Sequence, residues 1–239
     1  MNQNIVLIGG KACNGKSASL RNINNPSGVM YLNCENNKVL PFPDKFLSAT
    51  ILDPKKHMDE AFAYAEPKDD IHTIVIDTLT FLMDMYETQY VLASENTMQA
   101  WGEYAQYFKK LMNEKVAGSK KNIIILAHTS DIFNEKEMAV ETMVKVKGSL
   151  MNLGIESYFG TVLTAKKLSL KALESYESKL LNITEEEELL GFKYVYQTRL
   201  TRDTVNERIR APMGMWNANE TFIDNDIQLV IDRLHTYFK

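Results

Sequence analysis

The sequence predicts an α/β fold in which helices cover both faces of a mostly parallel central sheet. Short continuous apolar runs recur along the chain, and stretches of helical periodicity separate them. Such runs are typical of strands that are buried on both faces, and their alternation with helices is typical of parallel sheets. The chain has 239 residues, 45% of them apolar, which suffices for one large domain. We therefore expect a single domain over residues 1–239.

The expected elements follow one another in a regular order. Apolar runs predict strands at 4–9, 29–34, 48–53, 72–77, 122–128 and 160–168. Helices are expected at 16–23, at 57–66, in two stretches between the fourth and fifth strands, and at 147–159. In the second of those stretches apolar residues recur at spacings of three and four, namely Met98, Trp101, Ala105, Phe108, Leu111 and Met112. A last amphipathic helix follows a cap at Asp224 or Asn225.

Three segments depart from this alternation. Residues 129–147 have poor periodicity and mixed charge, which predicts a long mobile loop. Residues 170–191 predict a helical insertion, in which Thr184 and Glu187 fit a capping box. The runs "FKYVYQTRL" and "NERIRAPM" are joined by "TRDTV", and they predict a β-hairpin near the carboxyl end of the chain.

Charge and cysteine content narrow the functional classes. The net charge is −4 and the isoelectric point is about 5.7, which disfavours a broadly basic nucleic-acid binder. Two cysteines, Cys13 and Cys34, do not form a disulfide framework, and nothing resembles a secretory signal. The longest apolar runs are too short to span a bilayer. We therefore expect a protein of the reducing cytoplasm that has no membrane partner.

A phosphate-binding loop follows the first predicted strand. Residues 10–17 read "GKACNGKS" and match the pattern G-x-x-x-x-G-K-S in full. The glycines let backbone N–H groups converge on phosphate oxygens, while the lysine reaches the β- and γ-phosphates and the serine can hold Mg²⁺. The strand–loop–helix context disfavours a chance glycine turn. The predicted nucleotide-binding residues of this loop are Gly10, Lys11, Ala12, Cys13, Asn14, Gly15, Lys16, Ser17 and Ala18.

Polar residues stand at the carboxyl ends of three further strands. Asp77 ends "TIVID", as expected of a carboxylate that supports Mg²⁺, although an aspartate there can also cap a turn. Glu35 follows "VMYLNC" and is a candidate general base, with a solvated loop glutamate as the alternative. His128 ends "NIIILAH", where it can sense the terminal phosphate or simply bond the backbone. These strand ends border the ligand crevice of an open α/β sheet.

Several other residues are weaker candidates. Phe42, flanked by two prolines, can pack on an adenine or in the core. Lys145 and Lys147 lie two residues apart, so both face one way in an extended segment. They can contact DNA phosphates or a neighbouring subunit's nucleotide, or they can form a solvated pair. Arginines that suit phosphate, carboxylate or solvent gather near the predicted hairpin, namely Arg199, Arg202, Arg208 and Arg210.

The order of these features resembles the RecA-type ATPase core. The phosphate loop comes first, then the strands that end in Glu35, Asp77 and His128, and then a long loop and a helix. Over nearly the whole chain, segments also resemble the minimal RecA-like proteins of bacteriophages: "GVMYLNCE", "LPFPDKF", "HTIVIDTLTFLMDMY", "VKVKGSLMNLGIESYF", "RIRAPMGMW" and "FIDNDIQLV". The resemblance implies a RecA-like P-loop NTPase core as the fold.

The same resemblance implies an activity. It suggests a phage recombination protein that binds and hydrolyses ATP and acts on single-stranded DNA, in annealing or in support of strand exchange. By position it implies Lys16 and Ser17 on the phosphates and Mg²⁺, and Asp77 on the metal. Glu35 becomes the residue that activates water, and His128 the sensor of the γ-phosphate. The expected cofactors are therefore ATP and Mg²⁺.

The resemblance also suggests partners. Residues 129–147 become the candidate DNA loop, with Lys145 and Lys147 as contacts to DNA or to the nucleotide of a neighbouring subunit. This loop departs from the family pattern because it lacks glycine and contains three glutamates. Single-stranded DNA is the expected partner, with a single-strand-binding protein and a second copy of the chain as further candidates. The expected compartment is the cytoplasm of the phage's host.

Two other functions stay open at this stage. A P-loop kinase for a small molecule would need an arginine-bearing lid, which the arginines near residues 199–210 could supply. A regulatory module would bind ATP without hydrolysing it. Phosphate release without an added acceptor, stimulated by single-stranded DNA, would favour the RecA-like function over both.

Overall fold

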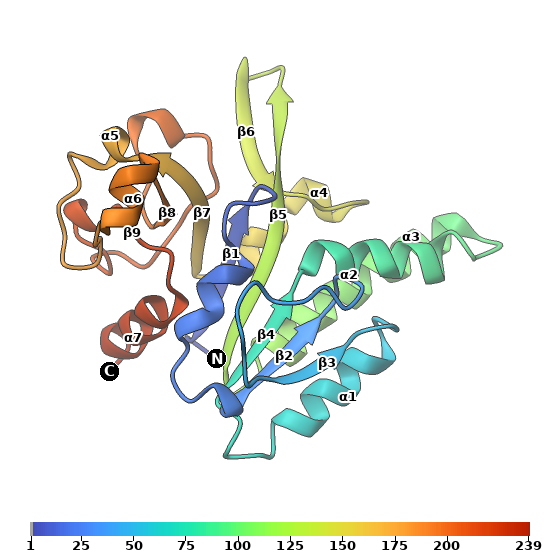
Figure 1. Cartoon of the computed structure of the whole chain (residues 1–239). Coiled ribbons are helices and arrows are strands. Elements are labelled where there is room, and N and C mark those ends of the chain that lie inside the picture. Colours follow the sequence, from blue (N-terminus) through green and yellow to red (C-terminus); the bar gives the residue numbers. More distant parts are fainter. Residues whose placement is uncertain (1) are drawn as a thin grey trace.

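A mostly parallel sheet organises the chain in the computed structural model, which describes residues 2–239 (Figure 1). The strands lie in the order β3-β2-β4-β5-β1-β7-β8-β9, and β6 pairs with the far end of β5. Their bounds are β1 (Ile5–Gly10), β2 (Val29–Asn33), β3 (Leu47–Thr50), β4 (Thr73–Asp77), β5 (Asn122–Asn134), β6 (Ala139–Val144), β7 (Thr161–Ser169), β8 (Phe192–Gln197) and β9 (Phe222–Asp224). Strands β3, β2, β4, β5, β1 and β7 are parallel, whereas β8, β9 and β6 join antiparallel to their neighbours.

Helices cover both faces of this sheet, so the predicted α/β class is confirmed. Their bounds are α1 (Lys56–Ala65), α2 (Leu79–Tyr86), α3 (Thr97–Lys110), α4 (Leu150–Leu153), α5 (Leu170–Leu173), α6 (Glu185–Leu190) and α7 (Ile227–Tyr237). A 3₁₀ helix, Ser17–Asn22, follows the phosphate loop. Helices α2 and α3 each continue into a π-helical turn, at Glu87–Val91 and Leu111–Val116.

Alternation along the strands divides the core into two apolar clusters. In β1, Ile5 and Leu7 belong to the cluster that contains the buried residues of α1, α2 and α3. Val6 and Ile8 belong to the cluster on the other face, which contains the 3₁₀ helix after the phosphate loop and α7. Successive side chains of a strand point to opposite faces, so a continuous apolar run fills both clusters at once.

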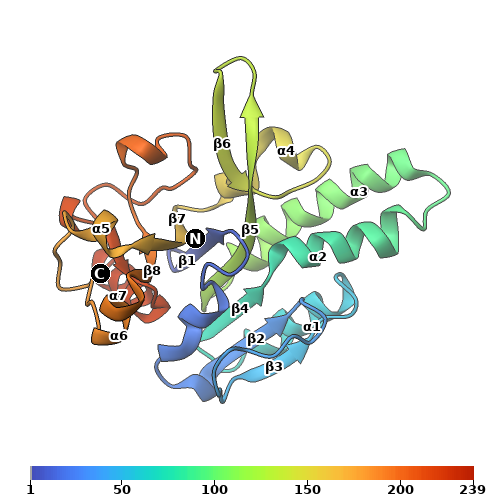
Figure 2. The same cartoon turned by 45° about the horizontal axis from the view of Figure 1, so that its top comes forward.

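Residues 129–144 form a β-ribbon, and this corrects the prediction of an irregular loop. Strand β5 continues past His128 to Asn134, and β6 returns antiparallel to it, with Thr129 opposite Val144. The ribbon projects beyond the rest of the sheet (Figures 1 and 2). Most of its outer side chains are exposed or half-buried. Because little of the ribbon is covered, no apolar alternation marks these strands in the sequence.

The predicted carboxyl-terminal hairpin is wrong in its second strand. Strand β8 does form from "FKYVYQ", but its partners are β7 and the short β9, whose residues are "FID". The segment "NERIRAPM" instead runs beside β6 and β7 and makes single bridges there, from Glu207 to Thr142 and from Arg210 to Val162. A three-residue strand is too short to show a period, which explains why β9 escaped prediction.

The two remaining expectations fall near the carboxyl end. Residues 170–191 contain α5 and α6, and Thr184 and Glu187 form the predicted capping box. Helix α7 is capped by Asp226 rather than by Asp224 or Asn225. Asp224 instead accepts from the Asn182 side chain, so its carboxylate is already engaged.

Within residues 2–239, no helix combines the length and the apolar character that crossing a membrane requires.

The aromatic cluster beneath the sheet generates a test of the packing. Phe108 of α3 is fully buried, and its ring lies 4.9 Å from that of Tyr104 and 5.7 Å from that of Tyr86. We predict that Phe108→Ala lowers the free energy of unfolding by about 3–5 kcal/mol, because it removes apolar contacts and leaves a cavity. Urea unfolding measures the change. Met98→Ala on the same helix removes a side chain that is 86% exposed, and it should change stability by less than about 0.5 kcal/mol.

Candidate functional site

The phosphate loop connects β1 to the 3₁₀ helix Ser17–Asn22, as the sequence predicts. Gly15 has φ of 84°, a left-handed conformation that favours glycine. A Cβ atom there would lie 2.3 Å from Nδ2 of Asn225, which donates a hydrogen bond to the Gly15 carbonyl at 2.9 Å. Asn225 therefore holds the loop from the far end of the chain. Sequence reasoning had assigned Asn225 only a capping role, and no local signal indicates this contact.

A cavity of about 420 Å³ opens beside the loop. It is lined by loop residues, by the ends of β2 and β4, and by the segment after β2. The lining residues are Ala12, Cys13, Gly15, Lys16, Ser17, Ala18, Tyr31, Glu35, Lys38, Val39, Leu40, Pro41, Asp77, His128 and Tyr194. The structure therefore brings together most of the predicted nucleotide-binding residues with Glu35, Asp77 and His128.

Three predicted loop residues do not line this cavity. Gly10 ends β1 and pairs with His128 across the sheet. Lys11 turns toward the ribbon, where its ammonium contacts the Asp131 carboxylate at 2.6 Å. Asn14 donates to the Ala165 carbonyl at 3.2 Å. The side chains of Lys11 and Asn14 brace the loop against β5 and β7, so any contact from these three residues to a nucleotide would come from the backbone.

Lys16 lies buried at the base of the loop. Its ammonium donates to the carbonyl oxygens of Gly10 and Lys11, both at 2.9 Å, and lies 3.3 Å from Nδ1 of His128. Burial lowers the pKa of Lys16 to about 8, against the opposing attraction of Asp77 and Glu35. The side chain is therefore mostly protonated at neutral pH, which suits an anionic ligand.

Asp77 ends β4 with a carboxylate that has one unsatisfied oxygen. Its Oδ2 accepts a hydrogen bond of 2.9 Å from the Tyr31 hydroxyl. Its buried Oδ1 has no hydrogen-bond partner among the residues that the structure describes. Burial raises the pKa of Asp77 above its ordinary value. A divalent cation would supply the missing partner and would favour the ionised form, and Ser17 lines the same cavity. Asp77 and Ser17 therefore fit a Mg²⁺ site.

Glu35 follows β2 and is held by two cationic or polar partners. Its Oε1 lies 3.4 Å from Nε2 of His128, and its Oε2 lies 2.9 Å from the Lys38 ammonium. The His128 hydrogen bond and then Lys38 lower the pKa of Glu35 to about 2, although burial opposes them. Glu35 is thus ionised throughout the neutral range, as a proton acceptor must be.

His128 connects the loop lysine to the candidate base. Its backbone N–H donates to Oγ1 of Thr80 at 2.9 Å, and its ring lies 5.9 Å from that of Phe81. Lysine donates and does not accept, so Nδ1 faces Lys16 as the acceptor and Nε2 carries the proton toward Glu35. The ring therefore bridges the two sides of the cavity. Position on β5 predicted that His128 would lie here, but not that it would contact both residues.

The predicted role of Phe42 in nucleotide binding needs correction. Phe42 does not appear among the cavity-lining residues, and its ring packs against Phe46 at 6.1 Å. Cys34 is fully buried in the core cluster below the sheet and does not line the cavity either. The aromatic side chains in the lining are Tyr31 and Tyr194. Tyr194 comes from β8, far along the chain, so local sequence patterns could not reveal it.

The two candidate lysines of "VKVKG" have different environments. Lys145 is exposed, and its backbone N–H donates to the His128 carbonyl at 2.9 Å. Lys147 is half-buried against α2, where its ammonium pairs with Asp84 at 2.9 Å and with Glu87. These carboxylates neutralise Lys147, which argues against its predicted contact with DNA or a neighbouring nucleotide. Lys145 keeps its predicted position as an exposed cation.

Two of the arginines near the predicted hairpin are also engaged within the chain. Arg199 donates to the Trp216 carbonyl at 2.7 Å. Arg208 lies within ion-pair distance of Glu141 and Glu156. Arg202 and Arg210 are exposed.

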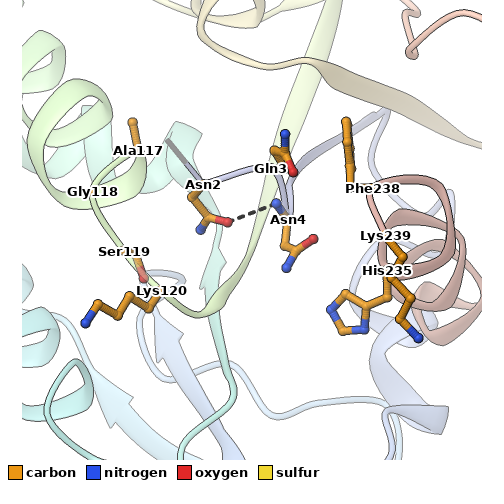
Figure 3. A pocket seen from close by; sticks show the side chains of 10 residues that line it. All are labelled: Asn2, Gln3, Asn4, Ala117, Gly118, Ser119, Lys120, His235, Phe238 and Lys239. Carbon is orange, nitrogen blue, oxygen red and sulfur yellow. Dashed lines mark hydrogen bonds between the residues drawn. The ribbon is translucent and has the colours of Figure 1, made fainter.

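A second and larger cavity lies at the opposite edge of the sheet. Its volume is about 560 Å³, and it is lined by the residues before β1 and β5 and by the end of α7 (Figure 3). Asn2 bonds the backbone of Asn4 there. This edge holds the amino ends of the parallel strands, whereas ligands of open α/β sheets bind outside the carboxyl ends. The larger volume of this cavity therefore does not make it the candidate nucleotide-binding site.

The loop, the strand order and the cavity together define an α/β fold of the P-loop, nucleotide-binding class. Strand β5, which carries His128, lies between β1 with its phosphate loop and β4 with Asp77. A family model described as an AAA domain matches residues 2–185. The chain belongs to this AAA-domain family, and ATP binding is the property that this class predicts for it.

No curated protein matches the chain. Among solved structures, the chain is similar to the flagellar accessory protein FlaH from Methanocaldococcus jannaschii, at 14% sequence identity and a TM-score of 0.39. The alignment covers 82% of this chain and 77% of the FlaH chain.

Cys13 provides a direct test of the cavity. It is exposed, lines the cavity and lies inside the phosphate loop. We predict that ATP with Mg²⁺, at ten times its dissociation constant, slows alkylation of Cys13 about tenfold by mass action. Peptide mass spectrometry measures the rate. Cys34 serves as an internal control that should stay unlabelled, because it is buried and burial raises its pKa. Equal Cys13 rates with and without nucleotide would contradict this assignment.

Proposed function

We propose that this protein is a Mg²⁺-dependent ATPase that acts on single-stranded DNA in recombination of the phage type. The observation that carries the ATPase part is the convergence of Lys16, Glu35, Asp77 and His128 on one cavity beside a complete phosphate loop. These residues come from four different parts of the chain. Ion pairing for stability does not require a phosphate loop at the same place, so a nucleotide explains the arrangement better.

Binding follows from the loop and from the strand ends. The backbone N–H groups of residues 12–17 and the Lys16 ammonium would bind phosphate oxygens. Asp77 and Ser17 would hold the metal ion, which supplies positive charge that neutralises the phosphates. Exchange of the Gly10 and Lys11 carbonyls for phosphate oxygens would keep the Lys16 ammonium satisfied and protonated.

Hydrolysis requires a base that accepts a proton from water. Glu35 would accept this proton as the water oxygen bonds to the terminal phosphorus and the bond from that phosphorus to ADP breaks. The Nε2 proton of His128 and the Lys38 ammonium both stabilise ionised Glu35, and they thereby weaken it as a base. Slow turnover is therefore part of the proposal.

The proposed action on DNA rests on the family resemblance and on the path of β5. This strand runs without interruption from His128 into the ribbon, so a shift of the histidine would reach the ribbon directly. The Lys11–Asp131 contact forms a second link between loop and ribbon. Lys145 at the base of the ribbon is an exposed cation that could bind a phosphate of the strand. A single-strand-binding protein and a second copy of the chain are further proposed partners, and the host cytoplasm is the proposed compartment.

The alternatives have unequal support. A kinase lid would need free arginines, and Arg199 and Arg208 are bonded within the chain, which leaves the exposed Arg202 and Arg210 for that role. A module that binds ATP without hydrolysing it has one observation in its favour, namely the two partners that restrain Glu35. Measurement of phosphate release decides between that module and the proposed ATPase.

The catalytic assignment predicts a large effect of a small change. Glu35→Gln keeps the shape of the side chain but cannot accept the proton, so we expect phosphate release to fall about 10²- to 10⁴-fold. Nucleotide affinity should change far less. The assay measures phosphate released with Mg²⁺ and ATP, with and without single-stranded DNA, over a range of protein concentrations.

Glu186→Gln, which alters an exposed glutamate of α6, is the matched control and should retain wild-type turnover. Full activity of Glu35→Gln would remove Glu35 from the mechanism. Dependence of specific activity on protein concentration would support a second copy of the chain as partner.

The DNA proposal predicts a salt-dependent contact at Lys145. Lys145→Ala should weaken binding of an oligonucleotide and reduce the slope of log affinity against log salt by about 0.7, the value for one phosphate contact on a single strand. Fluorescence anisotropy measures both. Lys171→Ala changes another exposed lysine, on α5, and should leave the slope unaltered. Equal binding with and without ATP would count against coupling between nucleotide and ribbon.

A further inference from the structure

The segment after Glu35 forms a tight turn that carries a lysine back over the cavity. Asn36 and Asn37 have φ of 50° and 60°, in the left-handed region that asparagine tolerates better than most residues. The Lys38 N–H donates to the Glu35 carbonyl at 3.0 Å, and the Lys38 carbonyl accepts from Nδ2 of Asn33 at 2.9 Å. Both backbone groups of Lys38 are therefore fixed, while its side chain is exposed and pairs with Glu35.

The Lys38 ammonium is the second cation of the site. It lies 2.9 Å from Oε2 of Glu35 and belongs to the lining of the cavity that also contains Lys16. Its side chain is 68% exposed, whereas that of Glu35 is only 9% exposed. Two lysines thus face two carboxylates, Glu35 and Asp77, around one cavity beside the phosphate loop.

We infer that Lys38 is a further phosphate-binding residue. When ATP binds, the Lys38 ammonium would move from the Glu35 carboxylate to the terminal phosphate. This inference rests on the proposed ATPase function. The lysine end of this pair is exposed, so solvent screens the ammonium and the long side chain must be held in place, which limits what the pair contributes to stability. A triphosphate carries more negative charge than one carboxylate, so it competes well for the exposed Lys38 ammonium.

The exchange would have a chemical consequence at Glu35. In the structure Lys38 and His128 each occupy one oxygen of the carboxylate. Departure of Lys38 uncovers Oε2 at the moment when a terminal phosphate is present, and this oxygen can then accept the proton of the attacking water. ADP has no γ-phosphate to attract Lys38, so Glu35 stays covered. Lys38 would therefore restrict the exposure of the base to the triphosphate state.

A purely structural role for Lys38 makes a different prediction. If Lys38 only neutralised Glu35, its removal would affect binding of the diphosphate and of the triphosphate alike, or neither of them. Discrimination between the two nucleotides is thus the readout that separates a phosphate contact from a local ion pair. Lys38 is exposed, so its replacement should leave the fold intact.

The experiment compares the affinities of AMP-PNP, a triphosphate analogue that resists hydrolysis, and of ADP, both with Mg²⁺, by titration calorimetry. Lys38→Met should weaken AMP-PNP binding about 10- to 100-fold and change ADP binding less than about threefold. Lys38→Arg, which keeps the charge, should recover part of the loss. Lys45→Met alters an exposed lysine of the same segment and should leave both affinities unchanged.

The outcomes separate this inference from the function on which it rests. If the wild type binds both nucleotides and Lys38→Met keeps the wild-type ratio of their affinities, the inference is overturned and the ATPase proposal stands. If the wild type binds neither nucleotide, both are overturned. Selective loss of AMP-PNP affinity in Lys38→Met supports the phosphate contact.

Discussion

The parallel alignment of β1, β2, β4 and β5 is the constraint on which the candidate site depends. Parallel neighbours must end at the same edge of the sheet, so residues that are far apart in the sequence meet there. Gly10 shares a register position with His128, and Asn33 shares one with Asp77. A slip of one residue would turn every buried side chain of a strand to the wrong face, so the two apolar clusters fix this register firmly. The packing of the core thereby sets the geometry of the cavity.

At this edge of the sheet, His128 contacts three other residues of the site. Its backbone is bonded to Thr80, its Nδ1 faces Lys16 and its Nε2 faces Glu35. Lys16 of the phosphate loop and the candidate base are therefore linked through one imidazole, and the next residue along the chain begins the ribbon. Coupling by direct contact of this kind needs no long pathway through the protein.

The fold class and the phosphate loop could be predicted from the sequence because each has a strong local signal, whereas Glu35, Asp77 and His128 were candidates because of their positions at strand ends. Buried parallel strands are continuous apolar runs, and the loop is a fixed pattern of glycine, lysine and serine. The features that were missed depend on contacts between distant segments or lack a period. Asn225 reaches Gly15 from the other end of the chain, and Tyr194 enters the cavity from β8. The largely exposed ribbon has no apolar alternation, and the carboxylates that hold Lys147 lie some sixty residues earlier, in α2 and in the π-helical turn after it.

Strand β5 has a mechanical consequence because it serves both the sheet and the ribbon. Its 13 residues would span about 40 Å as one extended segment, of which residues 129–134 account for roughly 20 Å outside the core. If residues 129–134 tilted as a rigid unit about a point near His128, a tilt of about 10° would move their outer end by about 3 Å. Displacements too small to rearrange the packed sheet could thus become displacements as large as a hydrogen bond is long. A small movement of β5 at the cavity would thus become a larger movement at the outer end of the ribbon.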